Sequence, residues 1–246
     1  MIEVKGLRKQ FGKLTAVDSI SFDAKDGEVT GLLGPNGAGK TTTLRMLYGL
    51  LKADDGLARI DGVDVIADPI GARAIMGILP DAHGLYQRLT AREHIDYFGR
   101  LHGLSDIELG KSAGELIEKL DMKAIANRRT AGFSQGEKVK TAVARALVHA
   151  PRNILLDEPT SGLDVMSTRA MRELILRLRD EGKCILFSSH IMQEVSMLCD
   201  KIVIVARGRI VAMGTPDDIR ELAQNEDLEE AFMVLARRGD DEEGRA

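Results

Sequence analysis

GPNGAGKTT, residues 34–42, follows an apolar run at residues 29–33 and opens a helical pattern at residues 42–51. The stretch fits the pattern Gly-x-x-x-x-Gly-Lys-Ser/Thr, in which glycines let the backbone close tightly around a bound group. Consecutive backbone N–H groups and the N-terminus of the following helix would then face an anion. A strand, a glycine-rich turn and a helix in this order therefore predict a phosphate-binding loop within an α/β fold.

The residue types of this loop suit a nucleoside triphosphate. Lys40 would carry its charge to the β- and γ-phosphates, and the Thr41 hydroxyl would bind Mg²⁺. The alternative is a glycine-rich turn that matches by accident, which the flanking strand and helix disfavour. The predicted nucleotide-binding residues of the loop are Gly34, Pro35, Asn36, Gly37, Ala38, Gly39, Lys40, Thr41 and Thr42.

The composition is that of a folded protein without a general attraction to nucleic acid. Of the 246 residues, 44% are hydrophobic and 29% are charged, and the formal net charge is −4. Disorder is therefore not expected over most of the chain, and no direct nucleic-acid partner is predicted. Cys184 and Cys199 show no C-x-x-C spacing, so we expect reduced, structural thiols.

No apolar stretch approaches the roughly 20 residues that are needed to span a bilayer. The N-terminal residues also lack the apolar segment of a signal peptide. Any membrane role is therefore expected to depend on a partner protein.

The order of the predicted elements indicates an α/β core with a helical insertion. Short β-like runs before residue 61 predict a small antiparallel sheet, and helical patterns fill residues 89–150. Thr90 and Ser105 are candidate N-caps, and Ser134 or Gln135 begins the third helix. Strands and helices then alternate, which predicts a mainly parallel sheet with buried strands. These later elements are strands at 154–157, 184–188, 201–206 and 209–213, and helices at 167–181, 192–198, after Thr215-Pro216, and at 228–238.

We expect a single domain at residues 1–222, followed by a C-terminal helix and a charged tail at residues 223–246. Within the domain, residues 1–88 and 151–222 would form the catalytic core and residues 89–150 a helical sub-lobe. No Pro-rich or Ser-rich linker marks the edges of the insertion, which favours a sub-lobe over a separate domain.

Asp157 and Glu158 end the apolar run at residues 153–156. Ligands of parallel α/β sheets bind at the carboxyl ends of the strands. Asp157 can hold hydrated Mg²⁺, and Glu158 can accept a proton from the water that attacks the γ-phosphate. The alternative is that they are two surface acids after a buried strand. The presence of the Lys40 loop in the same chain disfavours it.

His190 ends the next β-like run, so its imidazole is expected at the same edge of the sheet. It could hydrogen-bond an oxygen of the γ-phosphate. A single histidine after a strand is more often an ordinary surface or core residue. The position of His190 one strand beyond Glu158 favours the catalytic interpretation.

The order of these motifs closely resembles that of the ATP-binding cassette (ABC) ATPases over residues 2–222. It runs from the phosphate loop through Phe133-Ser134-Gln135-Gly136-Glu137 and Asp157-Glu158 to Ser161-Gly162-Leu163-Asp164 and His190. In that family a signature peptide, usually LSGGQ, caps the ATP that the opposite subunit holds. Its counterpart here, residues 133–137, begins a helix whose N-terminus can face an anion.

The resemblance implies a P-loop NTPase fold of the ABC-ATPase type, with ATP and Mg²⁺ bound in a head-to-tail dimer. It implies that Phe11 stacks on adenine, that Glu158 is the general base and that His190 is the switch histidine, with Lys40 as the third catalytic residue. The nucleotide-binding set is completed from the second subunit by Ser134, Gln135, Gly136, Glu137 and the seam residue Asp164.

Two departures from the family pattern affect the predicted site. Asp81 follows Pro80 where the family normally has Gln, and it is expected to approach Mg²⁺ through water, so the predicted metal set is Thr41, Asp81 and Asp157. Gln135 and Glu137 are the second departure. Because the peptide faces triphosphate, the side chain of Glu137 is expected to point away from it.

At these two departures and over residues 79–93, the sequence resembles those of the ATP-binding subunits of bacterial exporters of the sodium-extruding NatA type. Related drug and antibiotic exporters are similar as well. The resemblance implies a peripheral subunit at the cytoplasmic face of the inner membrane, which drives export by a separate integral membrane permease. Na⁺ or a drug is the candidate cargo. A soluble ABC ATPase that remodels nucleic acid or ribosomes is the alternative, disfavoured because one cassette is present. A weak regulatory cassette is disfavoured by Lys40, Glu158 and His190.

Overall fold

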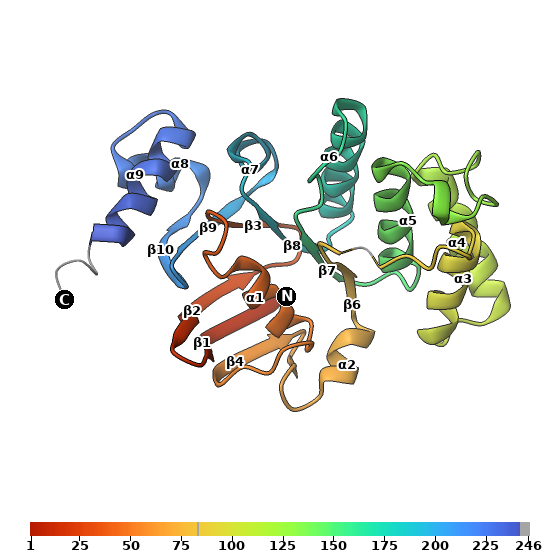
Figure 1. Cartoon of the computed structure of the whole chain (residues 1–246), viewed down its shortest axis with the longest axis horizontal. Helices are drawn as coiled ribbons and strands as arrows, with labels where there is room; N and C mark the ends of the chain where they lie inside the picture. The colour runs from red at the N-terminus through yellow and green to blue at the C-terminus, as the bar shows by residue number, and fades with distance from the viewer. Residues whose placement is uncertain (83, 242–246) are drawn as a thin grey trace.

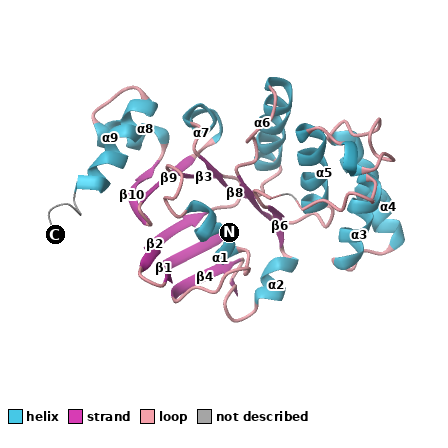
Figure 2. Cartoon of the chain, in the orientation of Figure 1, coloured by secondary structure: helices cyan, strands magenta, loops and turns pink. Residues whose placement is uncertain are grey.

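Two sheets form the centre of the protein, and helices surround them (Figure 1). The computed structural model describes residues 1–82 and 84–241. Figure 2 shows the strands gathered in the middle of the molecule, with one group of helices at each end. The α/β fold class predicted from the sequence is confirmed.

The larger sheet is mainly parallel, as predicted, and has the order β10-β9-β3-β8-β7-β6 within the described residues. Its strands are β6 (Met76–Leu79), β7 (Asn153–Asp157), β8 (Cys184–Ser189), β3 (Val29–Leu33), β9 (Lys201–Ala206) and the antiparallel β10 (Arg209–Gly214). β3, β7 and β8 are buried at every position, which explains their continuous apolar sequences. Leu33 pairs with Ser189, and Asp157 pairs with Ser188, so the carboxyl ends of these strands share one edge.

The smaller sheet is antiparallel and lies beside the phosphate loop. Its order within the described residues is β2-β1-β4-β5. The strands are β1 (Ile2–Phe11), β2 (Leu14–Ala24), β4 (Asp55–Ile60) and β5 (Val63–Asp64). Helix α1 (Lys40–Leu47) contacts β2 and β4 of this sheet and β7 of the larger one. The helix that follows the phosphate loop is therefore held between the two sheets (Figure 1).

The remaining helices of the core cover the larger sheet and its edges. α6 (Val165–Asp180) and α7 (Met192–Leu198) pack on β3 and β8, whereas α8 (Pro216–Ala223) and α9 (Leu228–Asp241) pack on β9 and β10. The short helix α2 (Pro69–Ala74) contacts β5 and β6. Among the helices in the described residues, none is long and apolar enough to cross a membrane.

The predicted helical insertion contains α3 (Ala91–Leu101), α4 (Asp106–Lys119), the short 3₁₀ helix η1 (Thr130–Gly132) and α5 (Gln135–Leu147). Thr90 and Ser105 cap their helices as predicted, and Ser134 caps α5, which begins at Gln135. Each cap forms a capping box with the glutamate three residues later. Because α5 packs on β6 as well as on α3 and α4, the insertion is joined to the core sheet. The proposed domain division at residues 1–88, 89–150, 151–222 and 223–246 stays a prediction.

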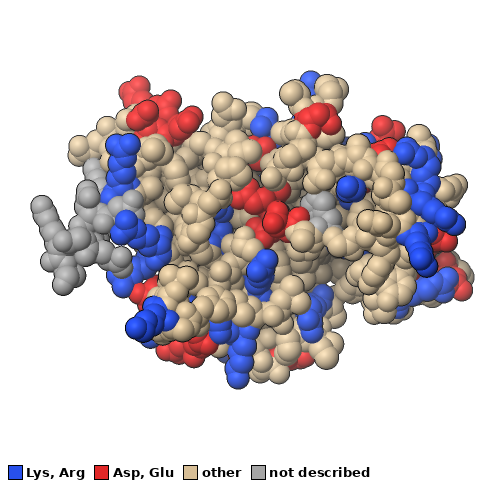
Figure 3. Space-filling model, in the orientation of Figure 1, with Lys and Arg blue, Asp and Glu red and all other residues tan. Residues whose placement is uncertain are grey.

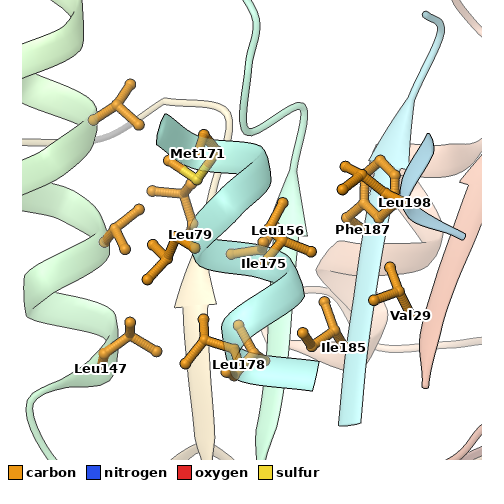
Figure 4. Close-up of a cluster of buried hydrophobic side chains, with 14 of the residues drawn as sticks. Val29, Leu79, Leu147, Leu156, Met171, Ile175, Leu178, Ile185, Phe187 and Leu198 are labelled. Atoms are coloured by element: carbon orange, nitrogen blue, oxygen red, sulfur yellow. The ribbon is translucent and has the colours of Figure 1, made fainter. Parts of the chain in front are cut away.

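Apolar side chains fix α6 against the larger sheet. Figure 4 shows Met171 and Ile175 of this helix beside Leu79 and Leu156 of the strands below it. Complete burial of a side chain of this size stabilises a fold by about 1.5–3 kcal/mol relative to exposure. The start of α6 is therefore fixed relative to the edge at which β7 ends.

Some element boundaries differ from the predicted ones. Helix α1 begins at Lys40 and ends at Leu47, not at 42 and 51, because Gly49 takes a left-handed φ of 65° and its N–H bonds to the carbonyl of Met46. Helix α9 extends to Asp241, beyond the predicted residue 238. The sequence patterns missed α2 and β5, and residues 242–246 of the predicted tail lie outside the described residues.

Candidate functional site

The loop between β3 and α1 is packed so closely that two of its positions require glycine. A Cβ atom on Gly34 would lie 2.2 Å from the backbone oxygen of Val205, and one on Gly39 would lie 2.5 Å from that of Ala16. Gly39 also has a φ of 103°, which L side chains rarely adopt. The loop is therefore confined between β2 and β9, and its backbone shape follows from that packing.

The buried ammonium of Lys40 joins the loop to the end of β7. Its Nζ donates to the carbonyl oxygens of Gly34 at 2.7 Å and Pro35 at 3.1 Å, and it lies 3.7 Å from Oε1 of Glu158. Burial lowers the pKa of Lys40, whereas the negative charges of Glu158 and Asp157 raise it. Lys40 thus stands between the phosphate loop and the acidic strand end.

Asp157 is buried at the end of β7, behind the phosphate loop. Its Oδ1 accepts hydrogen bonds from Oγ of Ser188 at 2.6 Å and from Oγ1 of Thr41 at 3.4 Å. Burial raises the pKa of Asp157, these hydrogen bonds lower it, and the charges of Asp81 and Glu158 raise it again. This group of oxygen atoms and negative charges is chemically suited to a hard divalent cation such as Mg²⁺.

Glu158 and His190 meet across neighbouring strand ends. Glu158 has a left-handed φ of 50°, and its N–H donates to Oγ of Ser188 at 3.0 Å. Its Oε2 lies 2.8 Å from Nδ1 of His190, while its Oε1 lies 3.7 Å from Nζ of Lys40. The Glu158 carboxylate therefore links the lysine of the loop to the histidine of the next strand.

Lys40, Glu158 and His190 border a cavity of about 890 Å³, within the size range of small-molecule sites. The sequence-predicted residues that line it are Phe11, Asn36, Gly37, Ala38, Gly39, Lys40, Thr41, Thr42, Asp81, Glu158 and His190. Gly34, Pro35 and Asp157 are not among the lining residues. They lie behind the residues that line the cavity. Gly34 and Pro35 accept hydrogen bonds from Lys40, and Asp157 accepts one from Thr41.

Phe11 lies at the end of β1 and at the edge of this cavity. The residue is 49% exposed, and Nζ of Lys9 lies 5.5 Å from the centroid of its ring. An exposed aromatic ring beside a cavity can stack on a planar group such as a base.

The sequence analysis missed part of the cavity wall, namely Leu14, Thr15, Ala16, Asp18, Ser161, Arg207 and Arg209. Arg207 lies in the turn between β9 and β10, and Arg209 is the first residue of β10. Gly208 of this turn donates its N–H to the carbonyl of Ala38 at 2.9 Å, and its own carbonyl accepts from Asp18 at 2.7 Å. The pairing of β3 with β9 brings this turn close to the phosphate loop. In the sequence, only the Arg207-Gly208 pair marks the turn.

The signature-like residues lie outside the cavity, at the start of α5. Ser134 is the N-cap, and its N–H donates to Oε2 of Glu137 at 2.8 Å. Oε1 of Glu137 lies 2.8 Å from Nη1 of Arg128. The backbone N–H of Ser134 lowers the pKa of Glu137, and Arg128 adds to the effect. The Glu137 carboxylate is therefore held against the start of its own helix.

Gly136, at the start of α5, packs closely against the start of α6. A Cβ atom at this position would lie 2.6 Å from Oγ of Ser167. Asp164 caps α6 and accepts hydrogen bonds from the N–H and the Oγ of Ser167 at 2.9 and 2.8 Å. Gln135 lies near the same corner, because a Cβ on Gly162 would lie 3.8 Å from its Cγ. The structure thus brings Gln135, Gly136 and Asp164 together on a corner that is separate from the cavity.

A family model described as "ABC transporter" matches residues 17–161, a range that includes the phosphate loop, the start of α5 and the acidic end of β7. The chain therefore belongs to the ABC transporter ATPases. It is an ATP-binding and ATP-hydrolysing subunit of an ABC transporter.

Two relatives and two solved structures illustrate the similarity. ABC transporter ATP-binding protein NatA of Bacillus subtilis is 44% identical over 91% of this chain and 92% of that protein. The linearmycin resistance ATP-binding protein LnrL of Bacillus subtilis is 37% identical over 89% of this chain and 70% of that protein. A solved ATP-binding subunit of an ABC transporter superposes with a TM-score of 0.89 at 31% identity, covering 96% of this chain and 99% of that one. A bacterial ABC transporter cassette solved as a dimer gives a TM-score of 0.81 at 25% identity, covering 87% and 98%.

The contact between Gly136 and Ser167 makes the corner sensitive to a single methyl group. We expect Gly136→Ala to lower the free energy of unfolding in urea by about 1–3 kcal/mol, because the new Cβ overpacks the corner. Gly132→Ala is the matched control, since a Cβ there meets no atom of the described residues within 4 Å. The double variant Gly136→Ala/Ser167→Ala should recover most of the loss. Equal losses for Gly136→Ala and Gly132→Ala would contradict this packing account.

Proposed function

We propose that two copies of this chain bind ATP head to tail, and that closure and hydrolysis drive export by a separate membrane permease. The cavity holds the phosphate loop, Glu158 and His190, whereas Ser134 and Gly136 lie on another part of the surface. A second copy would supply those residues to the cavity of the first. The similarity to a cassette solved as a dimer supports this arrangement.

The observation that carries the proposal is the position of the Glu158 carboxylate between Lys40 and His190. In the proposed reaction, Glu158 accepts a proton from water as the water oxygen bonds to the γ-phosphorus. The bond between that phosphorus and the β,γ-bridging oxygen breaks, which gives ADP and phosphate. Lys40 and the N–H groups of the loop balance the phosphate charge, and His190 orients a γ-phosphate oxygen.

Phe11 would stack on adenine at the cavity edge. Gly34, Pro35, Asn36, Gly37, Ala38, Gly39 and Thr42 would shape the phosphate loop. Ser134, Gln135, Gly136 and Asp164 would contribute contacts from the second copy. Because Glu137 is held by Ser134 and Arg128, we assign it a structural part in the signature rather than a phosphate contact.

We assign Mg²⁺ to the residues Thr41, Asp157 and Asp81. The oxygen donors of Thr41 and Asp157 already lie within 3.4 Å of each other, which fits the preference of Mg²⁺ for oxygen ligands. Asp81 lines the cavity and raises the pKa of Asp157 through its charge. Bound Mg²⁺ would supply positive charge that offsets the triphosphate and this carboxylate pair.

The membrane partner is proposed to dock near residues 81–92, between the core and the helical insertion, at the cytoplasmic face of the inner membrane. The cargo has two candidates. Resemblance to sodium-extruding transporters favours Na⁺, and similarity to a linearmycin resistance protein favours an antibiotic. Efflux of Na⁺ and of linearmycin, measured in cells that express the chain with the membrane protein encoded beside it, would decide between them.

The charge distribution gives no support to the competing role in remodelling nucleic acid. Basic and acidic side chains are interspersed over the face shown in Figure 3, with acidic groups near its middle. The formal net charge of −4 agrees with this mixture. Nucleic-acid binding depends mainly on clustered positive charge, so the transporter role is the better supported one.

Glu158→Gln tests the general base. We expect the variant to bind ATP but to hydrolyse it at least about 100-fold more slowly than the parent, because an amide cannot accept the proton. It should also accumulate as an ATP-bound dimer in size-exclusion chromatography. Glu173→Gln, a change of the same kind on the exposed face of α6, should retain parental phosphate release. Equal turnover in Glu158→Gln and the parent would remove Glu158 from this role.

Asp81→Gln tests the departure from the family pattern. In the isolated subunit we expect the Kd for Mg²⁺-ATP to stay within about threefold of the parent, because contact through water is weaker than direct coordination. The stimulation of ATPase activity by the membrane partner in proteoliposomes should change instead. Asp106→Asn, an exposed site on α4, serves as the control. A large loss of Mg²⁺-ATP binding in the isolated subunit would make Asp81 a direct metal ligand.

A further inference from the structure

Glu194 is a buried carboxylate that the proposed hydrolysis does not use. It lies in the first turn of α7, the helix that follows His190, and is 1% exposed. Its Oε2 accepts a hydrogen bond from Oγ1 of Thr160, and its Oε1 lies 3.5 Å from Nη2 of Arg172 on α6. A buried charge is costly unless it is paired and hydrogen-bonded. These partners therefore determine where Glu194 and α7 can lie.

Thr160 belongs to the short loop that begins at Glu158. It is 5% exposed, so its hydroxyl is shielded from solvent. The N–H of Ser161 bonds to the carbonyl of Glu158 at 3.1 Å, and the N–H of Leu163 bonds to the carbonyl of Thr160 at 3.2 Å. Because successive turns make this loop compact, a displacement of Thr160 would also displace Glu158.

His190 is coupled to Glu194 in the same way. The N–H of Ile191 donates to Oγ of Ser189 at 3.0 Å, and the N–H of Glu194 donates to the carbonyl of Ile191 at 3.2 Å. The turn that carries His190 is therefore continuous with the start of α7. The contact between Thr160 and Glu194 joins the same two segments as the contact between Glu158 and His190.

We propose that Glu194 is a positioning residue for ATP hydrolysis, which acts through Thr160 to fix the separation between the Glu158 carboxylate and the His190 imidazole. Arg172 balances its charge from α6. The inference rests on the proposed roles of Glu158 and His190. Glu194 and Thr160 lie outside the set of described residues that line the cavity, so neither acts by touching the nucleotide.

Replacement of Thr160 separates this role from nucleotide binding. Thr160→Val removes the hydroxyl at nearly constant volume, whereas Thr160→Ser keeps it. We expect Thr160→Val to lower kcat for ATP hydrolysis about tenfold, because the catalytic pair loses its fixed separation. The KM for ATP should stay within twofold of the parent value, and Thr160→Ser should restore kcat to within twofold of the parent.

Thr30→Val is the matched control. Thr30 is fully buried in β3, and its Oγ1 has no hydrogen-bond partner among the described residues. The Thr30→Val variant should therefore keep the parental kcat and KM. If Thr160→Val fails to fold, Glu194→Gln replaces it, because it keeps the side-chain size but removes the charge paired with Arg172. We expect that variant to lower kcat severalfold at unchanged KM.

The positioning role is wrong if kcat is unchanged in Thr160→Val, if Thr30→Val shows the same loss, or if Thr160→Ser fails to restore turnover. For the substitute Glu194→Gln, unchanged kcat has the same meaning. The role of Glu158 is tested separately. An inactive Glu158→Gln beside a fully active Thr160→Val refutes the positioning role and leaves the proposed function intact, whereas full activity of Glu158→Gln removes Glu158 as the general base of the proposed reaction.

Discussion

The parallel pairing of β3, β7 and β8 is the constraint on which the rest of the site depends. It places the phosphate loop, the acids after β7 and the histidine after β8 at one edge of a buried sheet. The loop itself has little freedom there, because Gly34 and Gly39 lie against the backbone of Val205 and Ala16. Packing of the core therefore fixes the distances within the site, which is the arrangement that electrostatic catalysis requires.

The charges at this edge explain how the protein can bind a triphosphate and then act on it. Asp81, Asp157 and Glu158 gather negative charge beside a single buried ammonium, that of Lys40, among the described residues. In the proposed function, a divalent cation would offset part of this negative charge and part of the charge of the triphosphate. The signature-like corner at Gly136 and Asp164 lies elsewhere on the same chain, so a second copy is the natural source of the missing contacts. In the proposed dimer, hydrolysis and association of two copies would then depend on the same site.

Most of the predicted site residues belong to short local sequence patterns. Residues that only the fold brings to the site have no such pattern and were missed. The phosphate loop, the acids at the end of β7, His190 and the capping boxes at Thr90, Ser105 and Ser134 are readable because each depends on residues close together in the chain. Arg207 and Arg209 were missed because the pairing of β3 with β9 brings them to the cavity. Asp18 was missed because it comes from β2 of the other sheet. The contact between Thr160 and Glu194 spans 34 residues and leaves no pattern. Helix α1 was overextended because a left-handed Gly49 ends it early.

Disulfide cross-linking between copies tests most directly whether the nucleotide site is shared. Chains with Asn36→Cys in the phosphate loop would be mixed with chains that carry Gln135→Cys in the signature, both with Glu158→Gln to preserve ATP. Background should be low, because Cys184 and Cys199 are buried. The account predicts a covalent heterodimer on oxidation with Mg²⁺-ATP, and little without nucleotide. A yield that does not depend on ATP, or the absence of cross-linking although ATP is bound, would contradict it.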